Sequence, residues 1–224
     1  MNKALLLLAV AVIFSGIYSC KKKSDAPANT ASVAFINGCA GTSGIDVKAN
    51  GVMVPGAANV SFLGNTGYRP VTAGSDMAIA CYLTNVGTLA TTKTVNLTAG
   101  SYYSAFSSGL LTAPSFLLVP DDHTAPSSSM AKVRLVNLSP DTMSVSAAVG
   151  STTIATGITS LTASAYFSVV AGPYEIKAGD PSNIATSVIT GTQQLGAGKI
   201  YTVILTGSQY STGQSGLKVT LLNN

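Results

Sequence analysis

Two copies of one sequence pattern occupy most of the 224-residue chain, and this duplication limits the folds that the chain can adopt. The stretch ASVAFIN at 31–37 recurs as AKVRLVN at 131–137. Later in each copy, LTAGSYY at 97–103 and LGAGKIY at 195–201 share the spacing L-x-A-G-x-x-Y, and the matches keep their order along the chain. Matches of this extent predict tandem domains of one fold rather than a single larger domain.

The two predicted domains span 31–122 and 131–224, and each is long enough to bury a core of its own. Between them, the stretch PDDHTAPSSS at 120–129 contains two prolines and no apolar pattern. Such a stretch is typical of a connection between folded units, so we predict a linker at 123–130.

Short runs of β-branched and aromatic residues alternate with turn residues in both copies. Their spacing of about 8–12 residues is typical of β-sandwiches, so we predict an all-β fold of two tandem β-sandwich domains. In the stretch KVRL, Lys132 and Arg134 alternate with apolar residues, which predicts one face in water and one in the core. In the second copy the predicted strands are 132–137, 144–149, 152–156, 165–170, 174–178, 185–190, 200–206 and 217–222.

The first 20 residues have the features of an export signal. Lys3 precedes the apolar run ALLLLAVAVIF at 4–14, which is short compared with the roughly 20 residues of a membrane span. Small residues and Cys20 follow, an arrangement that resembles the lipobox of bacterial lipoproteins, whose cysteine is acylated after cleavage. The resemblance implies a lipoprotein signal peptide at 1–20 and lipidation of Cys20. The alternative is an ordinary cleaved signal with a chance cysteine.

Residues 21–30 are polar and begin with three lysines, so we predict a tether whose cations lie at anionic lipid headgroups. From residue 31 onward the sequence contains eight Lys and Arg and seven Asp and Glu, and the positive residues do not cluster. Because nucleic-acid binding needs clustered cations, we expect no nucleic-acid partner. The expected location is the cell envelope of a Gram-negative bacterium, with the outer membrane as the anchoring membrane, on its periplasmic or surface face.

Three motifs of the second copy carry a family resemblance: VRLVNLSPD at 133–141, V-x-A-G at 169–172 and AGKIYTV at 197–203. Together they resemble the domain-of-unknown-function 4397 family of bacterial envelope lipoproteins, and the resemblance covers both copies. The first copy matches less closely, because it has no counterpart of the SPD at 139–141. The resemblance implies an immunoglobulin-like or transthyretin-like sandwich for each copy, and it implies no catalytic residues.

The repeated unit L-x-A-G-x-x-Y resembles the tyrosine corner of Greek-key sandwiches. In that feature a tyrosine hydroxyl bonds to the backbone a few residues upstream. Tyr103 and Tyr201 occupy the tyrosine position of the unit. Because both copies contain it, we interpret the two tyrosines as structural anchors rather than as parts of a binding site.

Two cysteines remain after the lipobox, Cys39 and Cys81, and both lie in the first copy. Their counterparts in the second copy are Ser139 and Gly179. An exported chain meets an oxidising compartment, which allows a Cys39–Cys81 disulfide. Two buried free thiols are the alternative, because the sequence does not show whether the two Cα atoms lie within about 7 Å.

Constellations of reactive or metal-binding residues are scarce in this sequence. The one histidine, His123, lies in the linker beside Asp121 and Asp122, where we expect these polar side chains to be solvated. A catalytic triad needs a firmly oriented histidine, which a linker does not provide. The sequence contains no His-x-x-x-His or Cys-x-x-Cys pair of the kind that binds zinc. We therefore expect no enzyme activity, no metal and no cofactor.

The polar stretch GSQYSTGQSG at 207–216 contains Tyr210, and tyrosine among small polar residues suits adaptable contacts. A solvated loop without a ligand is the alternative. We hypothesise a lipid-anchored envelope protein with a structural, adhesive or binding role. Its expected partners are membrane lipid, through acylated Cys20, and a surface glycan or protein. The alternative function is that of a carbohydrate-binding accessory lipoprotein that uses loop tyrosines such as Tyr210.

Overall fold

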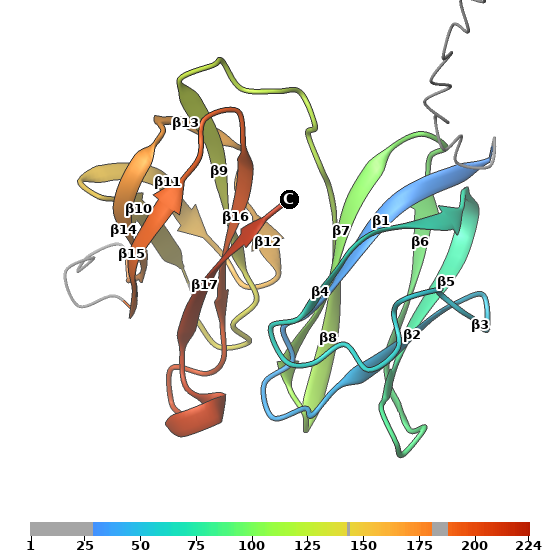
Figure 1. Cartoon of the computed structure of the whole chain (residues 1–224). Coiled ribbons are helices and arrows are strands. Elements are labelled where there is room, and N and C mark those ends of the chain that lie inside the picture. Colours follow the sequence, from blue (N-terminus) through green and yellow to red (C-terminus); the bar gives the residue numbers. More distant parts are fainter. Residues whose placement is uncertain (1–28, 143, 181–187) are drawn as a thin grey trace, which may run out of the picture.

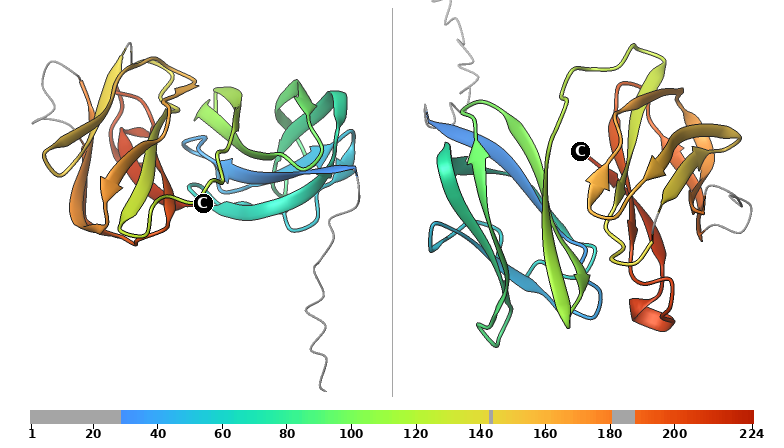
Figure 2. Two further views of the ribbon diagram at one scale, coloured as in Figure 1. Left: turned by 90° about the horizontal axis from the view of Figure 1, so that it is seen from above. Right: turned by 180° about the vertical axis from the view of Figure 1, so that it is seen from behind.

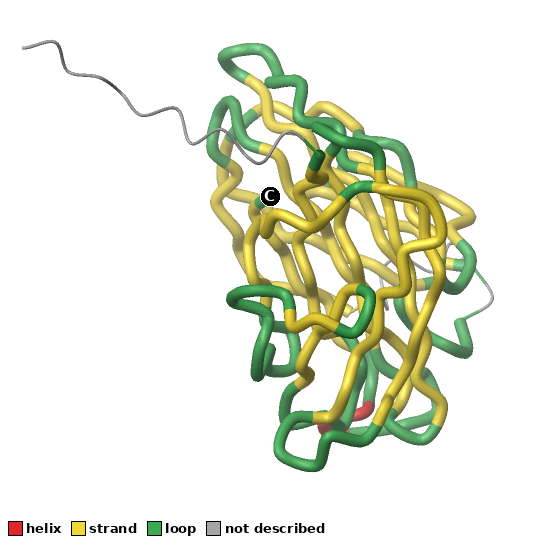
Figure 3. Tube along the Cα trace, turned by 90° about the vertical axis from the view of Figure 1, so that its right-hand side faces the viewer, coloured by secondary structure: helices red, strands yellow, loops and turns green. Residues whose placement is uncertain are grey.

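The computed structural model describes residues 29–142, 144–180 and 188–224 of the chain. Within these ranges nearly every regular element is a β-strand, and the helix is a single 3₁₀ turn, η2, at Gly213–Ser215 (Figure 3). The all-β prediction is therefore confirmed. The predicted signal peptide with Cys20 and the tether up to residue 28 lie outside the described residues.

The first copy folds into two four-stranded sheets with the strand orders β4-β1-β7-β8 and β3-β2-β5-β6. Strands β1 and β7 are parallel, and the other paired strands of this copy are antiparallel. The two sheets enclose an apolar core to which both contribute. The strands are β1 (Thr30–Asn37), β2 (Ile45–Ala49), β3 (Val52–Met53), β4 (Asn65–Thr72), β5 (Gly74–Leu83), β6 (Leu89–Leu97), β7 (Tyr102–Leu110) and β8 (Ala113–Pro120).

The second copy repeats this arrangement with the strand orders β12-β9-β16-β17 and β11-β10-β14-β15. Strands β9 and β16 form the parallel pair, and β12 and β13 together take the place that β4 holds in the first copy. The strands are β9 (Met130–Asn137), β10 (Val145–Val149), β11 (Thr152–Ile158), β12 (Thr162–Ala163), β13 (Phe167–Val170), β14 (Gly172–Gly179), β15 (Val188–Leu195), β16 (Ile200–Thr206) and β17 (Lys218–Asn223).

The strand order distinguishes between the two sandwich types that the family resemblance implies. In the immunoglobulin constant-type order, the first strand pairs with the second. Here β1 pairs instead with β4 and, in parallel, with β7, and β9 pairs with β12 and β13 and, in parallel, with β16. Each copy is therefore a β-sandwich of the transthyretin-like type.

The sequence predicts a strand at 185–190, of which 185–187 lie outside the described residues. Within the described residues, β15 spans Val188–Leu195 and continues past the predicted end through the polar run Gly191–Gln194. This is an edge strand that pairs with β14, and backbone pairing with a neighbour overrides the weak side-chain pattern there. The two-residue strand β12 was not predicted, because a run so short carries no periodicity.

The two sandwiches lie side by side and pack through one sheet of each (Figures 1 and 2). Along β1, Val33 and Phe35 belong to the core of the first sandwich, whereas Ala34 and Ile36 belong to a third apolar cluster between the sandwiches. We call this cluster the interdomain cluster. Its fully buried members are Ala34, Ile36, Phe106, Val136, Leu138 and Ile204.

Strand β9 alternates in the same way, so the prediction of a wet face for 132–135 is wrong at Arg134. Its side chain is buried, with 1% exposure, because the alternate face of β9 meets the other sandwich. Close approach also shapes the interface at Gly38, where a Cβ atom would lie 2.5 Å from Cδ1 of Leu138. The Thr206 hydroxyl donates a 2.6 Å hydrogen bond to the Gly38 carbonyl across the same boundary.

Candidate functional site

The two corner tyrosines make the same contact in their respective copies. The Tyr103 hydroxyl accepts a 3.2 Å hydrogen bond from the Thr98 amide, and the Tyr201 hydroxyl accepts one of 2.9 Å from the Gly196 amide. The Thr98 hydrogen bonds lower the pKa of Tyr103. Each tyrosine thereby ties the start of a central strand, β7 or β16, to the turn that precedes it.

Two buried asparagines, which were not predicted as structural residues from the sequence, lie at the ends of the opening strands β1 and β9. Asn37 and Asn137 end the repeated opening strands and are fully buried. The Asn37 amide nitrogen donates to Thr42 and to the Val60 carbonyl, while its oxygen accepts from the amide of Cys39. Asn137 makes the matching set of contacts with Thr142, Ile158 and Ser139. The sequence held one sign of this role, since ASVAFIN and AKVRLVN both end in asparagine.

Both cysteines of the first sandwich are buried free thiols in the structure. Burial raises the pKa of Cys39 to about 11, and burial together with the neighbouring Cys39 raises that of Cys81 to about 12. Such thiols have almost no thiolate at neutral pH and are unreactive in the folded state. The Cys39–Cys81 disulfide stays a prediction.

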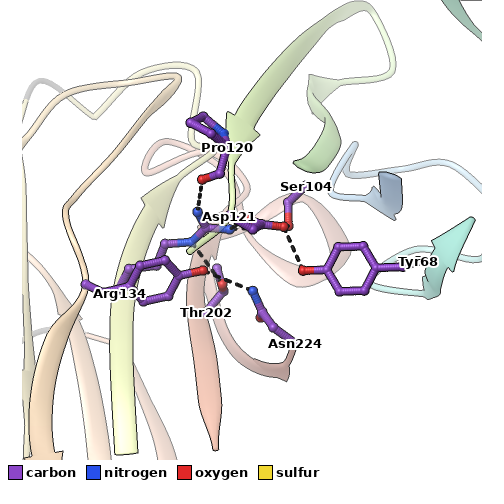
Figure 4. A network of polar contacts seen from close by, with 8 residues as sticks. Tyr68, Ser104, Pro120, Asp121, Arg134, Thr202 and Asn224 are labelled. Carbon is purple, nitrogen blue, oxygen red and sulfur yellow. Dashed lines mark hydrogen bonds and ion pairs between the residues drawn. The ribbon is translucent and has the colours of Figure 1, made fainter. Parts of the chain in front are cut away.

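A buried ion pair joins the two sandwiches at the centre of their interface (Figure 4). Arg134 of β9 lies 2.5 Å from Asp121, which follows β8, and both side chains are 1% exposed. The remaining guanidinium nitrogens donate to the Pro120 carbonyl at 3.1 Å and to the Thr202 hydroxyl at 3.1 Å. Since every guanidinium nitrogen has a partner, the arrangement meets the condition under which a buried ion pair is tolerated.

Asp121 is not solvated, contrary to the prediction from the sequence. Its second carboxylate oxygen accepts hydrogen bonds from the Tyr68 hydroxyl at 2.7 Å and the Ser104 hydroxyl at 2.8 Å (Figure 4). Burial, with the added charge of Asp121, raises the pKa of Tyr68. The prediction failed because folding brings the end of the first copy against the opening strand of the second.

Equivalent positions of the two copies meet around this pair. Tyr68 donates to the carboxylate, and its repeat counterpart Tyr166 lies under the Arg134 guanidinium, with its ring centroid 4.8 Å from Cζ. Burial raises the pKa of Tyr166 to about 12, although the Arg134 charge opposes this shift. Ser104 and its counterpart Thr202 both contact the guanidinium. The same face of each copy therefore forms the interface, as in a two-fold dimer.

Residues in and beside the linker reinforce the contact. The His123 ring stacks on Tyr102, with ring centroids 4.0 Å apart and planes at 23°, and meets the edge of Tyr68. Asp122 forms a 2.7 Å ion pair with Lys132, and its hydrogen bonds from Lys132 and Thr124 hold its pKa well below the usual range. Asp122 and His123 are nonetheless exposed, unlike Asp121, whose side chain is buried.

A small cavity lies between the two sandwiches. A cavity of about 40 Å³ lies beside the ion pair and is lined by residues of both sandwiches, among them Tyr68, Phe106, Thr202 and Asn224. Binding sites for drug-sized molecules enclose about 300–1,000 Å³. This cavity is much smaller than such sites, and the network beside it couples the two sandwiches.

Tyr210 projects from the loop between β16 and β17 and is 82% exposed. Asp141 fixes the loop, because it accepts hydrogen bonds from the Ser208 hydroxyl and the Gln209 amide, while the Gln209 side chain donates to its carbonyl. Burial alone would raise the pKa of Asp141, but the Ser208 and Gln209 hydrogen bonds outweigh it and lower the pKa. The loop therefore presents an exposed ring from a fixed base.

Two surface grooves occupy matching positions in the two sandwiches, beside the turn between the second and third strands. Their volumes are about 260 Å³ in the first copy and about 230 Å³ in the second. Apolar side chains lie exposed at each, with Val52 at 71% and Val170 at 59% exposure. Because both copies form this groove, it is a property of the scaffold.

Residues 29–142, 144–180 and 188–224 contain no group of three or more His, Cys, Asp or Glu side chains placed to hold a metal ion. In the same described ranges, no helix has the length and apolar character needed to cross a membrane.

Comparisons with known proteins give a family and distant structural neighbours. No curated protein matches the sequence. Among solved structures, a family 26 carbohydrate-binding module from Eubacterium rectale, bound to maltoheptaose, shares 9% identity over 86% of this chain and 97% of its own, with a TM-score of 0.26.

Two proposed cell adhesion proteins are also similar to the chain, and both share 11% identity with it. The one from Bacteroides uniformis has a TM-score of 0.26 over 87% of this chain and 98% of its own. The one from Bacteroides ovatus has a TM-score of 0.22 over 88% and 96%, respectively. Scores this low carry no inference about function.

The family model for the domain of unknown function DUF4397 matches residues 31–148 and again residues 131–224. The two matches together cover both sandwiches and include the opening strand, the mid-domain motif and the corner motif that carry the resemblance in the sequence. The chain belongs to the DUF4397 family and contains two copies of its domain.

Proposed function

We propose that the protein is a lipid-anchored, non-catalytic component of a bacterial cell envelope with an adhesive or binding role. The observation that carries this proposal is the buried interface, in which Arg134, Asp121 and the interdomain cluster pack the two sandwiches against each other. Two sandwiches joined in this way present their loops and sheet edges in a fixed arrangement relative to each other, and the tether keeps them near the membrane. The anchor itself is proposed from the lipobox at Cys20.

Cys20→Ala is expected to abolish incorporation of a fatty-acid analogue and to release the protein from the membrane fraction. Several acyl chains on one cysteine give stable anchoring, at about 0.8 kcal/mol per buried methylene, and the substitution removes their attachment point. Metabolic labelling followed by membrane fractionation measures both effects.

Cys39→Ser is the matched control for this test, because the second copy has Ser139 at the equivalent buried position. This variant is expected to keep both the label and the membrane association. Labelling that persists in Cys20→Ala would contradict the proposed anchor.

The second candidate function, carbohydrate binding through the loop of Tyr210, is favoured by one observation. An aromatic ring that is 82% exposed sits on a loop fixed by Asp141, and such rings stack on the faces of apolar or ring-shaped ligands. On a glycan array, Tyr210→Ala is expected to lose the signals that the natural chain gives. Tyr102→Ala, which alters an exposed tyrosine outside the loop, is expected to keep them; a blank array for the natural chain would contradict the candidate.

A further inference from the structure

A polar pocket of about 240 Å³ opens on the first sandwich, beneath the connection from β3 to β4. It shares only Asn65 with the cavity beside the ion pair, and none of its lining residues belongs to the loop of Tyr210. In contrast to the two scaffold grooves, its lining consists mainly of polar and small residues with one charged member. The lining residues are Gly56, Ala58, Asn59, Val60, Ser61, Gly64, Asn65, Thr66 and Arg69.

Arg69 is the one charged residue among those that line the pocket, and no carboxylate in the described part of the chain forms an ion pair with it. It is half-buried on β4, forms no ion pair with any described carboxylate, and has a buried Nε atom without a hydrogen-bond partner. Arginines that are withdrawn from water normally have their N–H groups satisfied, since an unpaired buried donor is costly. An acceptor from outside the chain would satisfy this guanidinium.

The local backbone is shaped to admit the guanidinium. Gly56 has a φ of +76°, in the left-handed region, and a Cβ atom there would lie 2.8 Å from Cζ of Arg69. The positive φ favours glycine at this turn, and the absence of a Cβ atom lets the guanidinium lie close to the backbone. Because β4 alternates, Tyr68 faces the second sandwich while Arg69 lies on the opposite side, against the β3–β4 connection.

Uncharged groups surround the cation. The Asn65 side-chain oxygen accepts a 2.8 Å hydrogen bond from the Gly67 amide, which leaves the Asn65 NH₂ group as a donor. Ser61 and Asn59 line the pocket with a hydroxyl and a second side-chain amide. The pocket is smaller than the roughly 300–1,000 Å³ of drug-sized sites, so it suits one ring or one substituent of a larger ligand.

We infer that this pocket binds an acidic saccharide through an oxyanion, a carboxylate or a sulfate, that pairs with Arg69. The planar guanidinium matches such a group with two parallel hydrogen bonds, and the amide and hydroxyl side chains match the sugar hydroxyls. The second copy has Phe167 in place of Arg69, so the site is specific to the first sandwich. The inference does not depend on the Cys20 anchor.

Isothermal titration of the full-length chain tests the inference with four probes: trigalacturonate, galactose 6-sulfate, neutral maltotriose and inorganic sulfate. One or both acidic sugars are expected to bind, and maltotriose is not. Arg69→Gln is expected to weaken that binding at least about tenfold, since it removes a charge-assisted hydrogen bond. Binding of the carboxylated or of the sulfated sugar identifies which oxyanion the pocket takes.

Lys93→Gln is the matched control, because it removes one exposed positive charge of the same sandwich outside the pocket. Its affinity is expected to equal that of the natural chain, and unchanged circular dichroism shows that each variant is folded. No binding of either acidic sugar, binding of inorganic sulfate alone, equal binding of maltotriose, or unchanged affinity in Arg69→Gln would each overturn the inference. None of these results bears on labelling at Cys20, so the two proposals fail separately.

Discussion

Asp121→Asn is expected to destabilise the folded chain by about 3–5 kcal/mol, because it leaves the Arg134 charge buried without compensation. Both side chains are 1% exposed, so water does not replace the lost carboxylate. Tyr68 and Ser104 also lose the charged acceptor to which they donate. Urea denaturation followed by circular dichroism measures the change in the free energy of unfolding.

Two further variants separate the buried charge from a general effect of removing an acid. Asp122→Asn disrupts a partly exposed ion pair with Lys132, for which a loss of at most about 1 kcal/mol is expected. The double variant Asp121→Leu with Arg134→Met replaces both charges by apolar side chains and is expected to recover most of the loss. A loss for Asp121→Asn no larger than that for Asp122→Asn would refute the account of this pair.

Phe106→Glu is expected to separate the two sandwiches while leaving each of them folded. Phe106 is fully buried in the interdomain cluster and does not belong to either sandwich core. Burying an ionised carboxylate there costs several kcal/mol, which the chain avoids if the interface opens to water. Double electron–electron resonance between spin labels on the two sandwiches is expected to give a broad distance distribution. The far-ultraviolet circular dichroism spectrum is expected to stay unchanged.

Phe116→Glu is the matched control for this variant. Phe116 lies on the neighbouring strand β8 but packs in the core of the first sandwich. The same substitution there is expected to unfold that sandwich and to reduce the β signal in circular dichroism. An unchanged narrow distance distribution in Phe106→Glu would show that the interdomain cluster does not hold the sandwiches together.

The duplication and the β pattern predicted most of the fold, because both are local properties of the sequence. Alternating runs indicate strands directly, and the repeated corner unit places Tyr103 and Tyr201 at equivalent turns. The pairing of β1 with β4 and β7 could not be read in this way. Such pairing depends on contacts between residues far apart in the chain, for which a single sequence has no local signal.

The sequence did not predict the interface, because β9, which has two buried faces, was interpreted as a strand with one buried face and one face in water. Arg134 occupies the position that Ala34 holds in the first copy, and a charge on an alternate face is normally exposed. Its partner Asp121 lies beside a linker, where a carboxylate is normally solvated. The match between Tyr68 and Tyr166 was visible in the sequence, but only the packed structure shows that both converge on this pair.

The most direct test that the two sandwiches form one rigid body is to measure the distance distribution between them. The measurement uses a chain whose interface residues are unaltered. Spin labels at Val86→Cys and Ser151→Cys, both exposed, report on the distance in a Cys20→Ala background. Cys39 and Cys81 remain unlabelled, because burial raises their pKa values to about 11 and about 12. The account predicts a single narrow distribution. A broad distribution, or several separate distances, would contradict it.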